Sequence, residues 1–303
     1  MSRICGGALC LLIAGTVTFA ATGMTSAAGP AITKQDAIRA ALFDDAALTL
    51  HLRSYLFDRS NNEGDDPAAW ATGGWVGYQT GWIGDMLRFG AVAYTSQPLW
   101  APEDRPGSLL LLPDQEGFSV LGQAYAALRY DGQLLTLGRQ LVDQPEINPH
   151  DNRMAPITYE GASLGGDVGI FSYYAAFLTA TKTRGSDKFE NFAEAAGVDS
   201  NEPMYLGGLA FSPGGDIKTR TSLYAVPDIL MSSYTDWQWS GQPDSYSFSL
   251  SGQVYCLKLE LAAELPSLHW TPPVPLNTLT RCPRNRQQAN GSLRLKRSER
   301  HLP

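Results

Sequence analysis

Segments in which apolar and polar residues alternate recur from residue 48 to residue 253. In Leu48–Phe57, leucines occupy most of the even positions and are separated by Thr49, His51 and Arg53. A period of two puts the leucines on one face of a strand and the polar groups on the other. The pattern predicts about ten strands: Leu48–Phe57, Trp70–Thr80, Met86–Thr95, Ser119–Tyr130, Gln133–Leu141, Ile157–Leu164, Ile170–Thr183, Met204–Ser212, Ile217–Val226 and Asp244–Gln253.

The predicted connections alternate strictly in length. The long ones are 58–69, 96–117, 142–156, 184–203 and 227–243, and the short ones are 81–85, 131–132, 165–169 and 213–216. Long loops at one end and tight turns at the other are typical of an outer-membrane β-barrel, whereas a β-sandwich gives no reason for this regularity. We therefore predict an all-β fold, an antiparallel transmembrane β-barrel of porin type.

Composition agrees with one lipid-facing side. Charged residues make up 17% of the chain, compared with about 25% in soluble globular proteins. The chain also contains 30 glycines. No stretch after the N-terminal region is apolar enough over about 20 residues to span as a helix. A chain like this can cross a membrane only as a barrel.

The N-terminus has the form of a secretory signal peptide. Arg3 precedes the apolar run Leu9–Ala20, and Ser26–Ala28 offers a small-residue cleavage site. We predict a signal peptide over residues 1–28 and a periplasmic lead-in over residues 29–46. Beyond Cys5 and Cys10 the only cysteines are Cys256 and Cys282, which excludes a disulfide framework and a cysteine metal site in the body.

No pattern points to an enzyme. Between residues 29 and 255 the only histidines are His51 and His150, and HExxH, Walker and GxGxxG motifs are absent. We therefore predict no catalytic residues, no metal and no cofactor. The acidic body gives no support for nucleic-acid binding.

The third long connection is more polar and rigid than a turn requires. It contains Asn148–Pro156, with two prolines. We expect it to fold into the barrel, where Asp151, Asn152 and Arg153 form a constriction. The alternative is that the charged groups only shape the loop through a local salt bridge or Asx-turn.

Strand parity selects the side chains that would line the pore. A charge at the lipid midplane costs about 2–4 kcal/mol, so basic groups on strands should point inward or lie at an interface. A row of such groups lowers the barrier for an anion, although they could instead pair with acids across the lumen. The candidates for the solute path are Arg53, Arg129, Arg139, Lys218, Arg220 and Tyr125.

Three segments, in order, resemble the OprD family of outer-membrane porins. They are Leu52–Arg59, Trp70–Ala71 with Tyr78–Gly81, and Asn148–Pro156 with Thr158–Gly161. The resemblance covers roughly residues 44–260. It implies a monomeric, substrate-selective barrel of about 18 strands with a narrowed lumen. It also implies assembly by the barrel-assembly machinery and passage of amino acids, carboxylates or oligosaccharides.

The C-terminal segment departs from the family. Residues 281–303 hold seven Lys or Arg and one Glu, and Pro266, Pro272, Pro273 and Pro275 would interrupt strands. We predict a barrel part over residues 47–255 that is open or incomplete, followed by an irregular tail over residues 256–303 translated from a shifted frame. The alternative is a genuine basic tail that binds anionic surfaces.

The expected function is passive, selective diffusion of small polar solutes across the bacterial outer membrane, in contact with its lipid. A secreted or periplasmic β-sheet protein that binds glycans on its tryptophans is one alternative. A non-functional porin fragment is the other.

Overall fold

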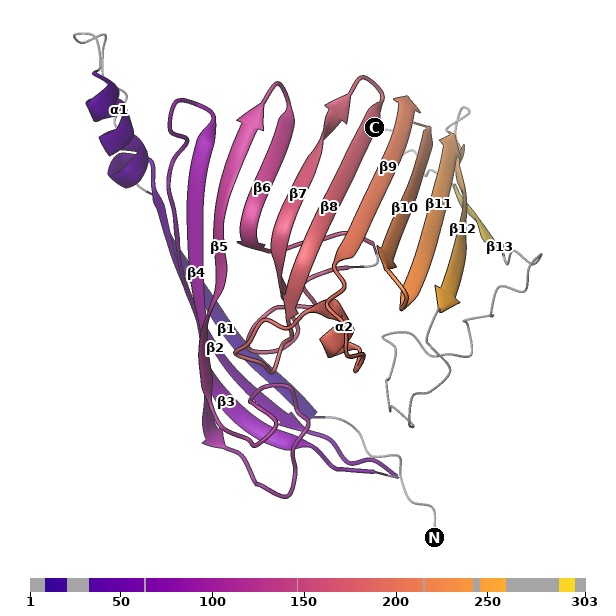
Figure 1. The fold of residues 1–303 in the computed structure, drawn as a ribbon. Helices are drawn as coiled ribbons and strands as arrows, with labels where there is room; N and C mark the ends of the chain where they lie inside the picture. Colours follow the sequence, from indigo (N-terminus) through magenta and orange to yellow (C-terminus); the bar gives the residue numbers. More distant parts are fainter. Residues whose placement is uncertain are drawn as a thin grey trace, which may run out of the picture. The chain divides into compact units, whose positions relative to one another are not determined.

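A computed structural model describes residues 9–20, 33–62, 64–145, 147–214, 216–241, 246–259 and 289–297, the first and last ranges by their backbone alone. The strands follow one another in chain order (Figure 1). The chain divides into two units. The first comprises Met1–Asp131, Leu135–Gly161 and Ala180–Glu190, and the second Gly132–Leu134, Ala162–Thr179 and Asn191–Pro303.

Helical structure is limited to short segments. Helix α1 (Lys34–Arg39) continues into the π-helical turn η1 (Ala40–Asp44) just before β2, and α2 (Phe192–Ala195) is a single turn. Thr33 caps α1, because its hydroxyl accepts the backbone N–H of Asp36. Among the described residues, no helix is long and apolar enough to cross a membrane.

The strands of the first unit form an antiparallel meander. β1 (Leu9–Ala20), β2 (Ala47–Asp58), β3 (Ala68–Gln79), β4 (Leu87–Trp100) and β5 (Phe118–Tyr130) each pair with the next. The register places His51 opposite Trp75 and Arg53 opposite Gly73. A bulge near Gly122 shifts the β4–β5 register by one residue.

β6 (Gln133–Gln140), β7 (Thr158–Val168) and β8 (Phe171–Lys182) follow and have residues in both units. In the second unit, β8 pairs with β9 (Met204–Gly214), and β10 (Ile217–Val226), β11 (Leu230–Gly241), β12 (Tyr246–Leu259) and β13 (Ala289–Arg297) continue the antiparallel pattern.

Alternation along β2 separates two unlike faces. Leu48, Leu50 and Leu52 are 46%, 40% and 61% exposed, whereas His51 and Arg53 are 8% and 7% exposed. Residues paired with these positions on β3, β4 and β5 point to the same side of the sheet as their partners. We call the side that carries His51, Arg53 and their register partners the inner face. The exposed side is apolar, as the sequence predicted for the lipid-facing side of a barrel.

Two loops cover the inner face of the first unit. Leu110 and Met154, one from each loop, are fully buried beside Tyr55 and Phe57 of β2. Ala155 packs with Tyr94 and Phe118. Burial of a Leu or Met side chain contributes about 1.5–3 kcal/mol. The loop 142–157 is therefore anchored by packing on the sheet, as expected for a loop that folds inward.

Two consecutive glycines let β2, β3 and β4 lie very close together. Gly74 has a φ of +126°, and a Cβ there would lie 1.9 Å from the carbonyl oxygen of His51. Gly73 has a φ of +152°, and its Cβ would lie 2.2 Å from the carbonyl oxygen of Thr95. Only glycine is compatible with this backbone.

The prediction of a loop over residues 227–243 is wrong. Residues 227–229 form a tight turn, and β11 begins at Leu230. Thus eleven strands, β2 to β12, occupy the region expected to hold about ten, and the strict alternation of connection lengths is broken by the short turn between β10 and β11. Ser232, Thr235 and Asp236 give this segment a loop-like composition. Met231, Trp237 and Trp239 nevertheless share one face and are 37–49% exposed.

Other boundaries differ from the expected ones. β7 continues through Gly165 and Gly166 to Val168, so the turn is limited to residues 169–170. β12 continues past Cys256 to Leu259, and β13 lies within the tail expected to be irregular. Prolines 266–275 fall outside the described residues. The frame shift stays a prediction, as does removal of residues 1–28, of which 9–20 form β1.

Gly74→Ala should destabilise the sheet by about 1–3 kcal/mol, since a methyl group meets a carbonyl oxygen at a positive φ. Gly207→Ala is the matched control, because a Cβ there has no neighbour within 4 Å. Chemical denaturation in lipid vesicles, followed by tryptophan fluorescence, would measure both. Equal stability of the two variants would contradict the close approach at Gly74.

Candidate functional site

The loop 147–157 is shaped by its own hydrogen bonds. The Asn148 side-chain oxygen accepts the backbone N–H of His150 at 2.9 Å, which is an Asx-turn. His150 has a φ of 44°, and its carbonyl accepts the N–H of Asn152 at 2.7 Å. Pro149 accepts the N–H of Ile157 at 2.8 Å. The Asx-turn considered from the sequence is therefore present, at Asn148.

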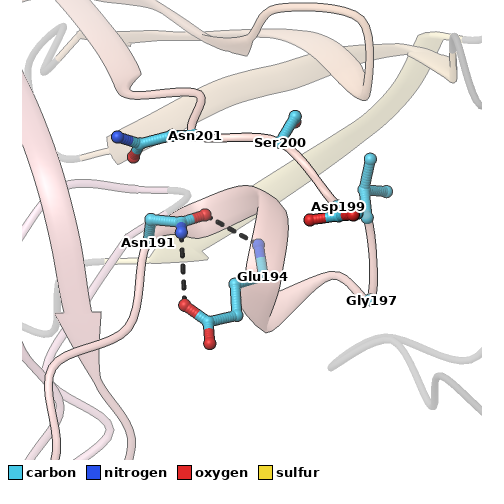
Figure 2. Close-up of a pocket in the computed structure, with 7 residues that line it drawn as sticks. Asn191, Glu194, Gly197, Asp199, Ser200 and Asn201 are labelled. Atoms are coloured by element: carbon cyan, nitrogen blue, oxygen red, sulfur yellow. Dashed lines mark hydrogen bonds between the residues drawn. The ribbon is translucent and has the colours of Figure 1, made fainter.

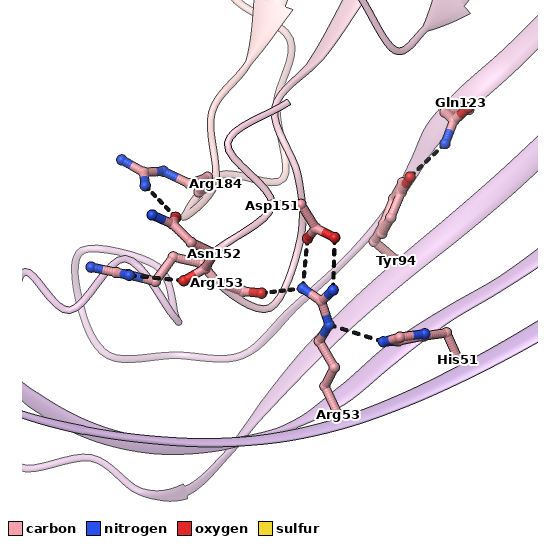
Figure 3. Close-up of polar contacts among 8 residues, drawn as sticks. All are labelled: His51, Arg53, Tyr94, Gln123, Asp151, Asn152, Arg153 and Arg184. Atoms are coloured by element: carbon pink, nitrogen blue, oxygen red, sulfur yellow. Dashed lines mark hydrogen bonds and ion pairs between the residues drawn. The ribbon is translucent and has the colours of Figure 1, made fainter. Parts of the chain in front are cut away.

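Asp151 does not pair locally but with Arg53 on strand β2. The Arg53 guanidinium donates to both carboxylate oxygens, at 2.6 Å and 2.7 Å, and also to the carbonyl of Arg153 (Figure 3). The Arg53 side chain is 6% exposed and that of Asp151 is 41% exposed. Such bidentate pairs fix geometry as well as charge. Both residues were candidates from the sequence, but their ion pair was not predicted.

Arg53 is held from the other side by His51 and Trp75. Its Nε donates to Nε2 of His51 at 3.0 Å, and its guanidinium lies 4.6 Å from the indole centroid of Trp75. The His51 ring stacks on Trp75 with centroids 3.8 Å apart and planes 5° apart. Because an arginine Nε–H can only donate, His51 must present an unprotonated Nε2.

Arg153 turns away from Asp151. Its Nε donates to the Ser108 carbonyl at 2.9 Å, and its guanidinium lies 4.8 Å from the Phe57 ring. The Asn152 carbonyl accepts Nη1 of Arg153 at 2.8 Å. The local salt bridge considered for Asp151 and Arg153 is not what the structure shows.

Arg184 joins this group and was missed from the sequence. Its Nη1 donates to the side-chain oxygen of Asn152 at 2.6 Å. Asn152 thus connects two guanidinium groups, one through its side chain and one through its backbone (Figure 3). Within the described part of the chain, neither Arg153 nor Arg184 forms an ion pair. Nothing in the local pattern around Arg184 pointed to this position.

Burial and charge act together on the titration of this loop. The pKa of His150 is lowered from its ordinary value, first because burial disfavours the charged imidazole and second because Arg184 repels it. The pKa of Arg184 is also lowered, by burial and then by Arg153. The site is therefore cationic and crowded.

Lys182 is a second residue that the sequence analysis missed. It is fully buried, and its Nζ lies 6.0 Å from the rings of both Tyr94 and Phe118. Its ammonium donates to the Thr183 carbonyl at 2.9 Å. Tyr94 in turn accepts a hydrogen bond from Gln123. The position of Lys182 near the end of a predicted strand was the only signal.

Arg129 and Tyr125 lie on the inner face of β5 toward its tight-turn end. Arg129 donates to the Asp85 carbonyl at 2.6 Å, and its guanidinium lies 4.2 Å from the Trp82 ring. The Tyr125 hydroxyl accepts a hydrogen bond from Gln79 at 2.7 Å. Arg129 therefore lies next to a turn rather than beside the loop 147–157.

Arg139 and Arg220 each pair with a carboxylate. Arg139 Nε lies 2.9 Å from Glu160 Oε2. Arg220 pairs with Asp236 on β11 at 2.8 Å. Lys218 is exposed and makes no ion pair with another described residue. Both pairs join neighbouring strands, so they are not the pairs across the lumen that the sequence left open.

A separate pocket of about 730 Å³ lies at α2 in the second unit (Figure 2). Its lining includes Asn191, Glu194, Asp199 and Asn201. Asn191 caps α2 by accepting the N–H of Glu194 at 2.7 Å. Among residues the structure describes, no group of three or more His, Cys, Asp or Glu side chains is placed to hold a metal ion.

Replacing Arg184 with Gln should raise the pKa of His150 toward the ordinary histidine value, because one repelling charge is removed while burial remains. NMR titration of the His150 ring in detergent micelles would measure the shift. Lys188→Gln removes the same charge from the same loop and should leave the pKa of His150 unchanged. An equal rise in both variants would contradict a specific effect of Arg184.

Comparison with solved structures shows the same fold. Pseudomonas aeruginosa OccK9 (OpdG) matches with a TM-score of 0.62 and 19% identity, covering 72% of this chain and 60% of the other. Acinetobacter baumannii OccAB2 matches with a TM-score of 0.63 and 20% identity, covering 73% and 59%. A BenF-like porin from Pseudomonas fluorescens Pf-5 gives 0.61 and 16%, covering 72% and 59%.

This chain therefore spans about three fifths of the length of these solved porins. A search among curated protein sequences found no match. The family model described as outer membrane porin, OprD family, matches residues 40–260. That family is found in the bacterial outer membrane, and its fold serves transport rather than enzymatic chemistry. By this match over most of its length, the chain belongs to the OprD family of outer-membrane porins.

Proposed function

We propose that the chain forms a channel for passive diffusion of small polar solutes across the outer membrane. The observation that carries the proposal is the loop 147–157 packed on the polar inner face of strands whose other face exposes leucines. A lipid-facing surface with a polar, narrowed interior is the arrangement of a selective pore. Family membership favours this function over glycan binding.

The charges on the loop favour negatively charged solutes. Arg53 neutralises Asp151. Arg153 and Arg184 have no carboxylate partner among the described residues. Two guanidinium groups beside a narrow path attract a carboxylate and orient it by bidentate hydrogen bonds. The crystal structure of P. aeruginosa OpdK with vanillate, an aromatic carboxylate, supports this solute class.

Other residues extend the proposed path. We assign Arg129, Arg139, Lys218, Arg220 and Tyr125 to the pore lining, and Asp151, Asn152 and Arg153 to the constriction. Among the pore-lining residues, Lys218 is the basic one whose charge no described carboxylate offsets, so it should contribute more to anion attraction than Arg139 or Arg220. The proposal includes a monomeric channel that depends on the barrel-assembly machinery, with residues 1–28 cleaved, residues 29–46 as a lead-in and residues 256–303 outside the barrel.

Reconstitution of the full chain in planar lipid bilayers should give discrete conductance steps. A salt gradient should show anion preference as a reversal potential, and Arg153→Gln with Arg184→Gln should move that potential toward cation permeation. Lys34→Gln in α1 is the control, because it removes one charge away from the inner face.

Heat-dependent mobility on a denaturing gel would establish that the inserted protein is folded. Folded protein that gives no conductance steps would overturn the proposed channel. Steps with an unchanged reversal potential in the double variant would overturn only the assignment of Arg153 and Arg184.

A further inference from the structure

Contacts within the protein use four of the five N–H donors of Arg53. Its Nε donates to His51, its two terminal nitrogens donate to the Asp151 carboxylate, and Nη1 also donates to the Arg153 carbonyl. These contacts join strand β2 to Asp151 and Arg153 of the loop 147–157. Arg53 is thus better suited to positioning this loop than to binding a solute.

The contact with His51 makes this arrangement depend on protonation. His51 Nε2 accepts from Arg53 at 3.0 Å and can do so only while it carries no proton. A proton on Nε2 would remove this acceptor and put a second positive charge against the guanidinium. The ring is held in its plane by stacking on Trp75, with centroids 3.8 Å apart.

The charged groups around His51 determine how a protonated ring would act on the loop. Arg53 on the same strand repels a protonated ring, and Asp151 on the loop attracts it. β3 contributes the neutral indole of Trp75, and β4 contributes Tyr94 beyond that indole. A protonated His51 would therefore compete with Arg53 for the one carboxylate that holds the loop.

We propose that Arg53, Asp151 and His51 form a proton-sensitive latch that holds the loop 147–157 on strand β2 and loosens it when His51 is protonated. Arg53 is a positioning residue in this latch. The inference goes beyond the proposed channel, because the position of the loop can be measured whether or not the protein conducts.

The neighbouring loop provides an internal control. Arg105 in the loop 101–117 pairs with Asp58 of β2 at 2.6 Å and donates to the Asp66 carbonyl at 2.7 Å. This second ion pair also joins a loop to strand β2, but among the described residues Arg105 makes no hydrogen bond to a histidine. It should hold equally well at neutral and mildly acidic pH.

Hydrogen–deuterium exchange of the full chain in detergent micelles, corrected for the intrinsic effect of pH, would test the latch. Between about pH 7.5 and pH 5, where histidine titrates, exchange in residues 147–157 should rise by roughly tenfold. Exchange in residues 101–117 should not rise. His51→Gln keeps an oxygen acceptor for Arg53 but cannot titrate, so its loop 147–157 should exchange at the same corrected rate at both pH values.

Asp151→Asn should raise exchange in residues 147–157 already at neutral pH, whereas Asp58→Asn should raise it only in residues 101–117. Protection of β5, residues 118–130, reports whether a variant is folded. If a variant loses that protection, the comparison of the two loops in the unsubstituted protein still tests the latch. The latch would be overturned if exchange rose in acid in both loops, or if the rise in residues 147–157 persisted in His51→Gln. Unchanged exchange of residues 147–157 in folded Asp151→Asn would also overturn it.

Discussion

The separation of polar and apolar groups onto opposite faces of each strand is the constraint on which this structure depends. On β2 the exposed leucines make any charge on their side costly in lipid, so Arg53 and His51 must lie on the inner face. Once there, a buried guanidinium needs partners, because an unpaired buried charge is strongly unfavourable. The loop 147–157 supplies the carboxylate. The lipid-facing surface and the loop position are therefore consequences of the same alternation.

Packing and charge cooperate in placing this loop. Met154 and Ala155 are fully buried, so the segment belongs to the hydrophobic core as much as to the polar site. Arg53 joins Asp151 to β2 between these apolar contacts, while Asn152 holds Arg153 and Arg184 on the other side. A loop fixed at so many points presents its charges in a defined arrangement, as electrostatic selection of a solute requires.

Period two was a reliable guide to the fold where leucines or glycines mark the two faces, as in Leu48–Phe57. It failed at β11, where polar residues and tryptophans resemble a loop in composition although Met231, Trp237 and Trp239 do share a face. Local sequence also named Arg53 and Asp151 singly, but their pairing spans 98 residues and depends on the loop docking. Arg184 and Lys182 could not be found for the same reason, because only tertiary structure brings them to Asn152 and Tyr94.

The buried Met154–Ala155 pair limits how the selectivity of such a protein can be redesigned. Exchanging the whole segment for that of another porin would remove core side chains together with the charged ones, and each large buried side chain lost costs about 2–5 kcal/mol. Asn152 is exposed and reaches two arginines without packing in the core. Single replacements at Asn152 and Arg184 are thus the economical route to a new filter, and loop grafting is the poor one.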